Sequence, residues 1–314
     1  MRESLENRLV VKLVFEHDTS PYVHVGAGRE LGAGTLKALK IGGSSTTYLI
    51  PSTSLKGVLR RIADHIGKSL ARNPRNLEEA LLKCHCETED SGIRHVGCSD
   101  SELKLISEYV EKSFRDGSIQ RFLSEDVIER TRRMLRNSKV LQVLRKNHAL
   151  EPLLAFRCPI CRLYGGPGLG GKVFVNNVVI TDGSASFITR ASIERVSGRV
   201  REGALFTVEA LTLPKFEVTL IVENIELNTL EPLIIAGTLE WLLKLGLEVG
   251  GMKSTGLGHY RLSTTESKGL IINYNNIKNS EDLIMKLTAI EKLLEDTGTS
   301  VDTLIKQLRQ SKPM

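Results

Sequence analysis

Two helices dominate the hydrophobic pattern of the chain. From Ser54 onward, apolar residues recur at spacings of three and four, which predicts an amphipathic helix that Ser54 caps. The segment 229–247 is apolar on nearly every side, so we expect a second helix that packs on a sheet. β-Branched and apolar residues predict strands at 8–16, 173–180, 204–213, 216–222 and 258–263.

The other segments are predicted as an insertion, an arm and a tail. Residues 76–157 have local helical patterns around a polar, cysteine-containing loop, so we interpret them as a largely helical insertion. Residues 187–204 are predicted as a β-hairpin arm, and residues 264–314 as a helical C-terminal extension. Without the insertion, residues 1–263 follow the order strand, helix, strands, helix, strand. This βαββαβ order predicts an α+β domain of the ferredoxin-like, RRM-like type.

Composition adds a modest basic surplus to this picture. The chain is 41% hydrophobic and 25% charged, which is ordinary for a globular protein. Its 43 Lys and Arg against 37 Asp and Glu give a net charge of +6, which suits a polyanionic partner without requiring one. The chain is charged from Arg2 and has no apolar run of membrane-spanning length. We therefore expect a cytoplasmic protein with no membrane partner, whose five cysteines are metal ligands or free thiols rather than disulfides.

Residues 250–261 form a glycine-rich segment that is a candidate anion site. Glycine permits positive φ, and free N–H groups beside Lys253, Ser254 and Thr255 are typical of a phosphate cradle. A mononucleotide P-loop does not fit, because Met252 displaces the lysine by one position, and a dinucleotide motif lacks its third glycine. A tight turn without a ligand remains the alternative.

Two other basic sites are candidates for nucleic-acid contact. Lys56 and Arg60 lie one turn apart near the start of the first helix, where free N–H groups favour phosphate. The arm interleaves apolar Ile193 and Val196 with basic side chains, which suits a clamp on nucleic acid. Its arginines are Arg190, Arg195, Arg199 and Arg201. A solvated helix end and an exposed hairpin are the alternatives.

Cys158 and Cys161 have the C-x2-C spacing with which two thiolates share one tetrahedral metal ion. Together with upstream cysteines they predict a structural zinc site, with the ligands Cys86, Cys98, Cys158 and Cys161. Cys84 or His85 could replace one of these ligands, and unrelated reduced cysteines remain the alternative. A redox role is weaker, because no thioredoxin-like βαβ unit surrounds the pair.

Four motifs occur in an order that matches a known family. They are residues 50–60, residues 158–165, residues 192–209, and the glycine-rich segment 250–258. Over about residues 8–263 the chain resembles the RAMP superfamily of CRISPR-associated proteins, and most closely the backbone subunits of type III effector complexes. The resemblance implies a modified RRM-like fold with a hairpin thumb and, in some such proteins, a zinc-bound insertion. It also implies partners: guide RNA along which subunits polymerise, target RNA, and other CRISPR-associated subunits.

The resemblance further implies that the separate anion candidates line one RNA groove. The residues so assigned come from the loop after the first strand, the first helix, the arm and the glycine-rich segment. They are His24, Gly26, Ser54, Lys56, Arg60, Arg190, Arg195, Arg199, Gly251, Lys253, Ser254, Thr255, Gly256 and Gly258.

The loop after the first strand departs from the target-cleaving members of the family, which carry an aspartate there. Here the loop has no aspartate, Ala38 stands in the expected neighbourhood, and Glu30 is the nearest acid. Alanine can neither hold a metal ion nor act on a 2′-hydroxyl. We therefore expect an RNA-holding subunit without catalytic residues. A target-RNA endoribonuclease, a precursor-RNA endoribonuclease that uses His24 and Tyr22, and an RNA-binding module outside CRISPR systems remain alternatives.

Overall fold

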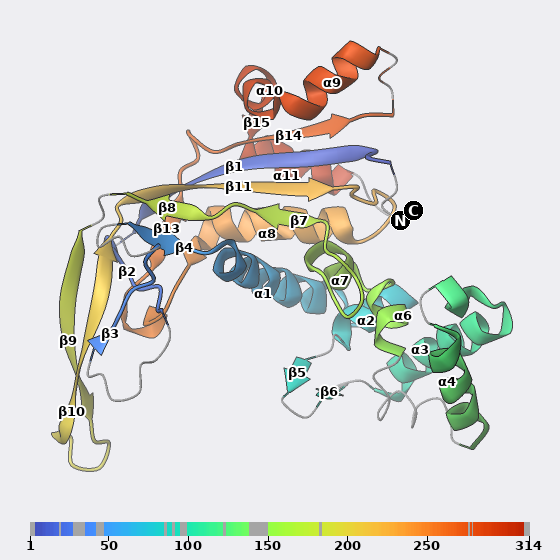
Figure 1. Ribbon diagram of the computed structural model, residues 1–314, viewed down its shortest axis with the longest axis horizontal. Helices are drawn as coiled ribbons and strands as arrows, with labels where there is room; N and C mark the ends of the chain where they lie inside the picture. Colours follow the sequence, from blue (N-terminus) through green and yellow to red (C-terminus); the bar gives the residue numbers. More distant parts are fainter. Residues whose placement is uncertain are drawn as a thin grey trace. The chain divides into compact units, whose positions relative to one another are not determined.

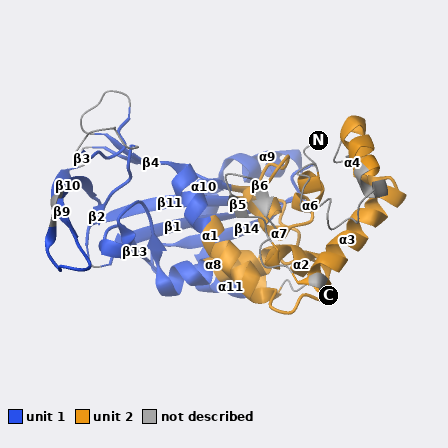
Figure 2. Cartoon of the chain, turned by 90° about the horizontal axis from the view of Figure 1, so that it is seen from below, with its two compact units in different colours: residues 1–59, 174–221, 239–306 blue, residues 60–173, 222–238, 307–314 orange. Residues whose placement is uncertain are grey.

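The structure is a computed structural model of the 314-residue chain. It describes residues 4–18, 20–27, 35–41, 47–84, 87–89, 92–94, 99–121, 124–137, 150–181, 184–275, 277 and 279–310. The chain divides into two compact units (Figure 2). Unit 1 comprises residues 1–59, 174–221 and 239–306, and unit 2 comprises residues 60–173, 222–238 and 307–314. Strands and helices both contribute, so the fold is α+β, as predicted.

A seven-stranded sheet, most of whose residues belong to unit 1, has the main order β12-β13-β1-β11-β7 (Figure 1). β1 is buried along most of its length, as a central strand should be, whereas β11 alternates between buried and exposed residues. Phe216 of β11 packs against Phe15 and Tyr260, with ring centroids 5.4 and 4.7 Å apart. The strands are β1 (Asn7–His17), β7 (Val173–Val175), β11 (Lys215–Glu223), β12 (Leu247–Glu248) and β13 (His259–Leu262).

The C-terminal tail adds a strand that the sequence pattern did not predict. β14 pairs antiparallel with β1 over six residues, and β15 continues the sheet beyond it. Gly269 lets helix α11 approach β14, because a Cβ there would lie 2.4 Å from Leu304. The tail elements are β14 (Lys268–Asn273), α9 (Ser280–Thr288), α10 (Ile290–Thr297), β15 (Thr299–Ser300) and α11 (Val301–Gln310).

Helices α1 (Ser52–Leu70) and α8 (Glu231–Leu245) confirm the two helices predicted from periodicity. α1 begins before Ser54, so the prediction that Ser54 caps it is wrong. The N–H of Ser52 instead donates to Asn177 Oδ1 at 2.7 Å, and this contact satisfies one of the free N–H groups of the first turn.

The predicted arm is present as a long hairpin of β9 (Ala185–Ile193) and β10 (Val200–Thr212) (Figure 1). Near its root, β10 also pairs with β2 (Tyr22–Val23) and, in parallel, with β3 (Thr35–Leu36). The predicted strand 173–180 is divided. Its first half is β7, and its second half is β8, which pairs instead with β4 in a separate two-stranded sheet. The bounds are β4 (Tyr48–Ile50) and β8 (Val178–Ile180).

The described part of residues 76–157 belongs to unit 2 and is largely helical, as predicted, with one short hairpin, β5-β6. The last part of the helix predicted over 124–148 lies outside the described residues. No helix in the described ranges is long and apolar enough to span a bilayer. The elements of unit 2 are α2 (Leu77–Lys83), β5 (Glu87–Glu89), β6 (Gly92–Arg94), α3 (Asp100–Arg115), η1 (Ser118–Arg121), α4 (Glu125–Asn137), α6 (Glu151–Ala155) and α7 (Pro159–Tyr164).

Candidate nucleic-acid interface

The Gly loop, residues 250–258, connects β12 to β13 in unit 1 and depends on glycines with positive φ. Gly250, Gly256 and Gly258 have φ values of 86°, 89° and 72°. A Cβ on Gly258 would lie 1.9 Å from Val249 O, and one on Gly250 would lie 2.4 Å from His24 O. A Cβ on Gly256 would meet no atom within 4 Å. Close backbone packing thus requires two of these glycines, whereas only backbone conformation favours the third.

Most N–H groups of the Gly loop are not free to bind an anion. Gly251 donates to His24 O at 2.7 Å, and Gly258 donates to Tyr22 O at 2.9 Å. The N–H groups of Thr255, Gly256 and Leu257 donate to carbonyls within the loop. The prediction of a cradle of successive free N–H groups is therefore wrong for these positions. Within the described residues, the N–H groups of Gly250, Met252, Lys253 and Ser254 are left without a hydrogen-bond partner.

The side chains of the short 3-10 turn η3 (Lys253–Thr255) differ in what they can offer a ligand. Thr255 donates its only hydroxyl proton to Met252 O at 2.9 Å, so it can accept but not donate to phosphate. Ser254 is exposed and Lys253 is half-buried. Neither side chain has a hydrogen-bond or ion-pair partner in the part of the chain that the structure describes. Among the described residues, the side-chain donors of the loop that have no partner are therefore those of these two neighbouring residues.

Two other segments of unit 1 lie against the Gly loop. His24 and Tyr22 hold it through their carbonyl groups, as described above, and Arg190 of β9 donates from Nη2 to Thr255 O at 3.1 Å. Apolar packing supports the same contact, because Leu257 is buried in a small cluster with Val208 and Ala210 of β10. The structure therefore brings together three of the predicted RNA-contacting segments. They are the loop after β1 that contains Tyr22 and His24 (the strand-end loop), the part of the arm around Arg190 and Val208 (the arm root), and the Gly loop.

Glu209 of β10 is a buried carboxylate at this site that the sequence pattern did not reveal. Its side chain is 5% exposed, and it accepts from the N–H of Ala38 at 2.9 Å, from Lys40 at 3.0 Å and from the Tyr48 hydroxyl at 3.3 Å. Burial by itself would raise the pKa of Glu209, but the Ala38 N–H and the Lys40 ammonium lower it below the ordinary value. Glu209 is therefore ionised and fixes the segment around Ala38.

His24 is held at the same place. It is 6% exposed, and its Nδ1 is hydrogen-bonded to the backbone carbonyl of Glu209 at 2.9 Å. Gly26 forms a bridge with Ala38, so the two sides of this loop run antiparallel. A buried, hydrogen-bonded imidazole suits a structural role better than contact with solvent-borne RNA.

The other predicted RNA-contacting residues lie elsewhere. Ser54 and Lys56 are half-buried in the first turns of α1. Arg60 belongs to unit 2, where its guanidinium donates to Gly165 O at 3.0 Å. Arg195 and Arg199 are exposed in the turn at the tip of the arm. Apolar side chains are exposed beside them, among them Val196 at 95% and Ile193 at 65%.

The cysteines are described only in part. Cys158 and Cys161 form no disulfide and are 3% and 6% exposed, at the start of α7. Cys84 is disulfide-bonded, so the expectation that the cysteines are metal ligands or free thiols rather than disulfides is wrong for this residue. Cys86, Cys98 and His85 lie outside the described residues. Among the described residues, no three His, Cys, Asp or Glu side chains gather as metal ligands.

Comparison with known proteins identifies the family. The family model of the RAMP superfamily matches residues 19–261, a span that contains the strand-end loop, the insertion, the arm and the Gly loop. The chain therefore belongs to the RAMP superfamily, and the family makes it a CRISPR-associated, RNA-binding protein. No curated protein shows significant similarity to the chain.

Proposed function

We propose that the chain is a backbone subunit of a type III interference complex, which assembles along guide RNA and holds its phosphates without cleaving RNA. The observation that carries this proposal is the convergence of the arm root, the strand-end loop and the Gly loop in a RAMP protein. Lys253, Ser254 and the arm arginines are the groups that contact RNA. Other CRISPR-associated subunits and target RNA are its partners.

The strand order supports a modified ferredoxin-like, RRM-like domain. Four strands lie in the order β13-β1-β11-β7. Along the chain α1 falls between β1 and β7, and α8 falls between β11 and β13. A βαββαβ unit with its last and first strands adjacent, followed by its third and second, has this arrangement. The hairpin β9-β10 between β7 and β11 is then the thumb.

The surroundings of Ala38 support a subunit without catalytic residues. Ala38 is 3% exposed, and residues 35–41 contain no acid. The nearby carboxylate of Glu209 already accepts from an ammonium, a hydroxyl and an N–H group, which disfavours its use to hold a metal ion or to accept the proton of a 2′-hydroxyl. The burial of His24 likewise disfavours the precursor-cleaving alternative.

Footprinting tests this proposal. Purified protein is incubated with guide RNA and then with complementary target RNA, and we expect protection that repeats at a fixed interval with the target left intact.

Lys253→Ala should lower the slope of log affinity against log salt by about 0.7, because one phosphate contact is lost. Lys292→Ala, on the exposed surface of α10, removes the same charge outside the site and should leave the slope unchanged.

Each alternative function has its own outcome in this experiment. Cuts in the target at regular spacing would establish a target-RNA endoribonuclease, and cuts in precursor RNA would establish the processing enzyme. Binding without periodic protection would indicate an RNA-binding module that does not assemble along a guide.

We also propose a structural zinc ion bound by Cys158 and Cys161 together with Cys86 and Cys98. Both described thiols are buried and form no disulfide. Gly166 lets the backbone pack closely against Cys161, because a Cβ there would lie 3.0 Å from its Sγ. Four thiolates would close a tetrahedral site of the structural kind. Zinc binding by this ligand set would require the form of the protein in which the disulfide of Cys84 is reduced.

Metal analysis of protein purified without chelator should find about one zinc ion per chain, the number that a single closed site holds. Cys158→Ser should bring the zinc content below half an equivalent and lower the melting temperature, because metal binding contributes to folding. If the natural protein contains no zinc, and if Cys158→Ser leaves the melting temperature unchanged, the site is refuted.

A further inference from the structure

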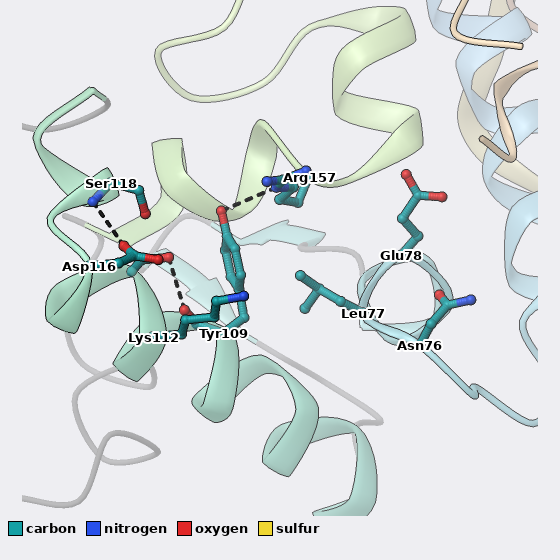
Figure 3. Close-up of a pocket in the computed structure, with 9 residues that line it drawn as sticks. Asn76, Leu77, Glu78, Tyr109, Lys112, Asp116, Ser118 and Arg157 are labelled. Carbon is teal, nitrogen blue, oxygen red and sulfur yellow. Dashed lines mark hydrogen bonds between the residues drawn. The ribbon is translucent and has the colours of Figure 1, made fainter. Parts of the chain in front are cut away.

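Unit 2 contains a pocket of about 540 Å³ that the proposed RNA-holding site does not use (Figure 3). It lies between the start of α2, the second half of α3 and the segment that joins α6 to α7. The residues that matter for its chemistry are Leu77, Glu78, Tyr109, Lys112, Asp116 and Arg157.

Tyr109 gives this pocket an aromatic wall. Its hydroxyl accepts a hydrogen bond from Arg157 Nε at 3.4 Å, and the Arg157 guanidinium carbon lies 5.7 Å from the ring centroid. Across the pocket, the side chain of Leu77 points toward the ring (Figure 3). A planar group could therefore lie on the ring between an apolar side chain and a guanidinium.

The charged groups of the pocket are unequally engaged. The carboxylate of Glu78 is bound by the Arg162 guanidinium at 2.9 Å. The Asp116 carboxylate accepts from the Ser118 N–H at 2.9 Å, and its hydrogen bonds with Ser118 lower the pKa of Asp116. Lys112 and Arg157 are exposed, and neither has an ion-pair partner within the described residues. The Asp116 carboxylate likewise has no ion-pair partner among the described residues and lies in the field of Lys112. With Glu78 offset by Arg162, the pocket keeps two cations against one carboxylate, which is a net positive charge.

We propose that this pocket binds one nucleotide of single-stranded RNA, with the base on Tyr109 and the phosphate at Lys112 and Arg157. The choice of RNA rests on the proposed function. An aromatic ring beside unpaired cations is the chemistry by which proteins hold single strands, because each base offers a face for stacking and each phosphate a negative charge. An inorganic anion would use the cations but not the ring. The subunit thus has a second RNA contact, in unit 2, besides the Gly loop and arm of unit 1.

Crosslinking of the full-length protein to 5-bromouridine-substituted single-stranded RNA tests the contact at Tyr109. We expect a crosslinked peptide that contains Tyr109. Tyr109→Ala should weaken binding of the same RNA about 10-fold, because one stacked base is lost, whereas Tyr109→Phe keeps the ring and should bind within about twofold. Lys112→Ala and Arg157→Ala should each lower the salt slope by about 0.7.

A matched control on the same helix is Lys104→Ala. Lys104 is 77% exposed and does not line the pocket, so this variant should retain the slope of the natural protein. Melting temperatures of all the variants show whether a loss of binding reflects unfolding.

Three outcomes overturn the inference in different ways. If Lys253→Ala lowers the salt slope while the pocket variants do not, and no crosslink forms at Tyr109, the pocket does not bind RNA and the proposed function stands. If the salt slope is unchanged both by Lys253→Ala and by the pocket variants, the proposed function fails as well. If inorganic phosphate removes the Tyr109 crosslink when chloride at equal ionic strength does not, and Tyr109→Ala binds RNA normally, the pocket is a simple anion site.

Discussion

Gly258→Ala is expected to destabilise the protein by about 2–5 kcal/mol and to abolish the native shape of the Gly loop. Positive φ at an alanine costs about 1–2 kcal/mol. The new Cβ would also lie 1.9 Å from Val249 O, so the backbone must move. This movement breaks the hydrogen bonds that Gly258 makes with Val249 and Tyr22, each with a net contribution of about 0.5–1.5 kcal/mol. Urea unfolding and RNA titration measure the two effects.

Gly256→Ala is the matched control for this substitution. Gly256 has a similar φ of 89°, but a Cβ there would meet nothing within 4 Å. Only the conformational cost of about 1–2 kcal/mol applies, and RNA affinity should fall much less. Equal losses of stability in the two variants would show that close approach to Val249 does not shape the loop.

The sequence predicts best the elements that carry long, regular patterns. α1, α8, β1 and the arm have such patterns, and all are present. β14 is a short strand in a weakly patterned tail, and its pairing with β1 joins residues more than 250 positions apart, so local periodicity gives no signal for it.

The break between β7 and β8 shows how tertiary contacts override a local pattern. Residues 173–180 are apolar except for Asn176 and Asn177. Asn176 Oδ1 accepts from the N–H of Thr219 at 2.7 Å, and Asn177 Oδ1 accepts from the first turn of α1. The two amides thus lie where β7 ends its pairing with β11 and where β8 begins its pairing with β4. The pair of asparagines was the available signal for this break.

The candidate site was predictable in its location but not in its donors. Glycines and a lysine mark the Gly loop in the sequence. Whether its N–H groups are free depends on His24 and Tyr22, which reach it only through the tertiary fold. Glu209 was missed for the same reason, because its partners Ala38 and Tyr48 lie 171 and 161 residues away. A glutamate between Val208 and Ala210 in an apolar strand was the only local signal.

Arg162 is the other motif residue to which the sequence assigned no role, and the structure makes it the centre of a buried ion network in unit 2. It is 6% exposed. Its Nε lies 2.7 Å from Glu231 Oε1, and its Nη2 lies 2.9 Å from Glu78 Oε1. Lys172 is the second cation, 3.0 Å from Glu231 and 2.8 Å from Glu226. The network thus joins α2, α7 and the start of α8.

Arg162→Ala is expected to destabilise the protein by about 3–5 kcal/mol, the cost of removing one partner from a buried pair. Glu231 is 0% exposed and, among the described residues, would keep only Lys172 as a counter-ion. Urea unfolding at neutral pH measures the loss. Arg133→Ala breaks an exposed pair with Glu129 on α4, both side chains 68% exposed, and should change stability by less than about 1 kcal/mol.

The pH dependence of the Arg162→Ala variant separates an uncompensated charge from lost packing. Burial already raises the pKa of Glu231, and removal of the guanidinium raises it further. A carboxyl group with a raised pKa in the folded state binds more protons there than in the unfolded state. The free energy of unfolding of the protein therefore falls as the pH rises. The loss of stability in the variant, relative to the natural protein, should therefore be complete above the folded pKa of Glu231. It should shrink as the pH is lowered through that pKa. A deficit that stays constant between neutral pH and pH 5 would mean that Arg162 stabilises the fold through packing and not through its charge.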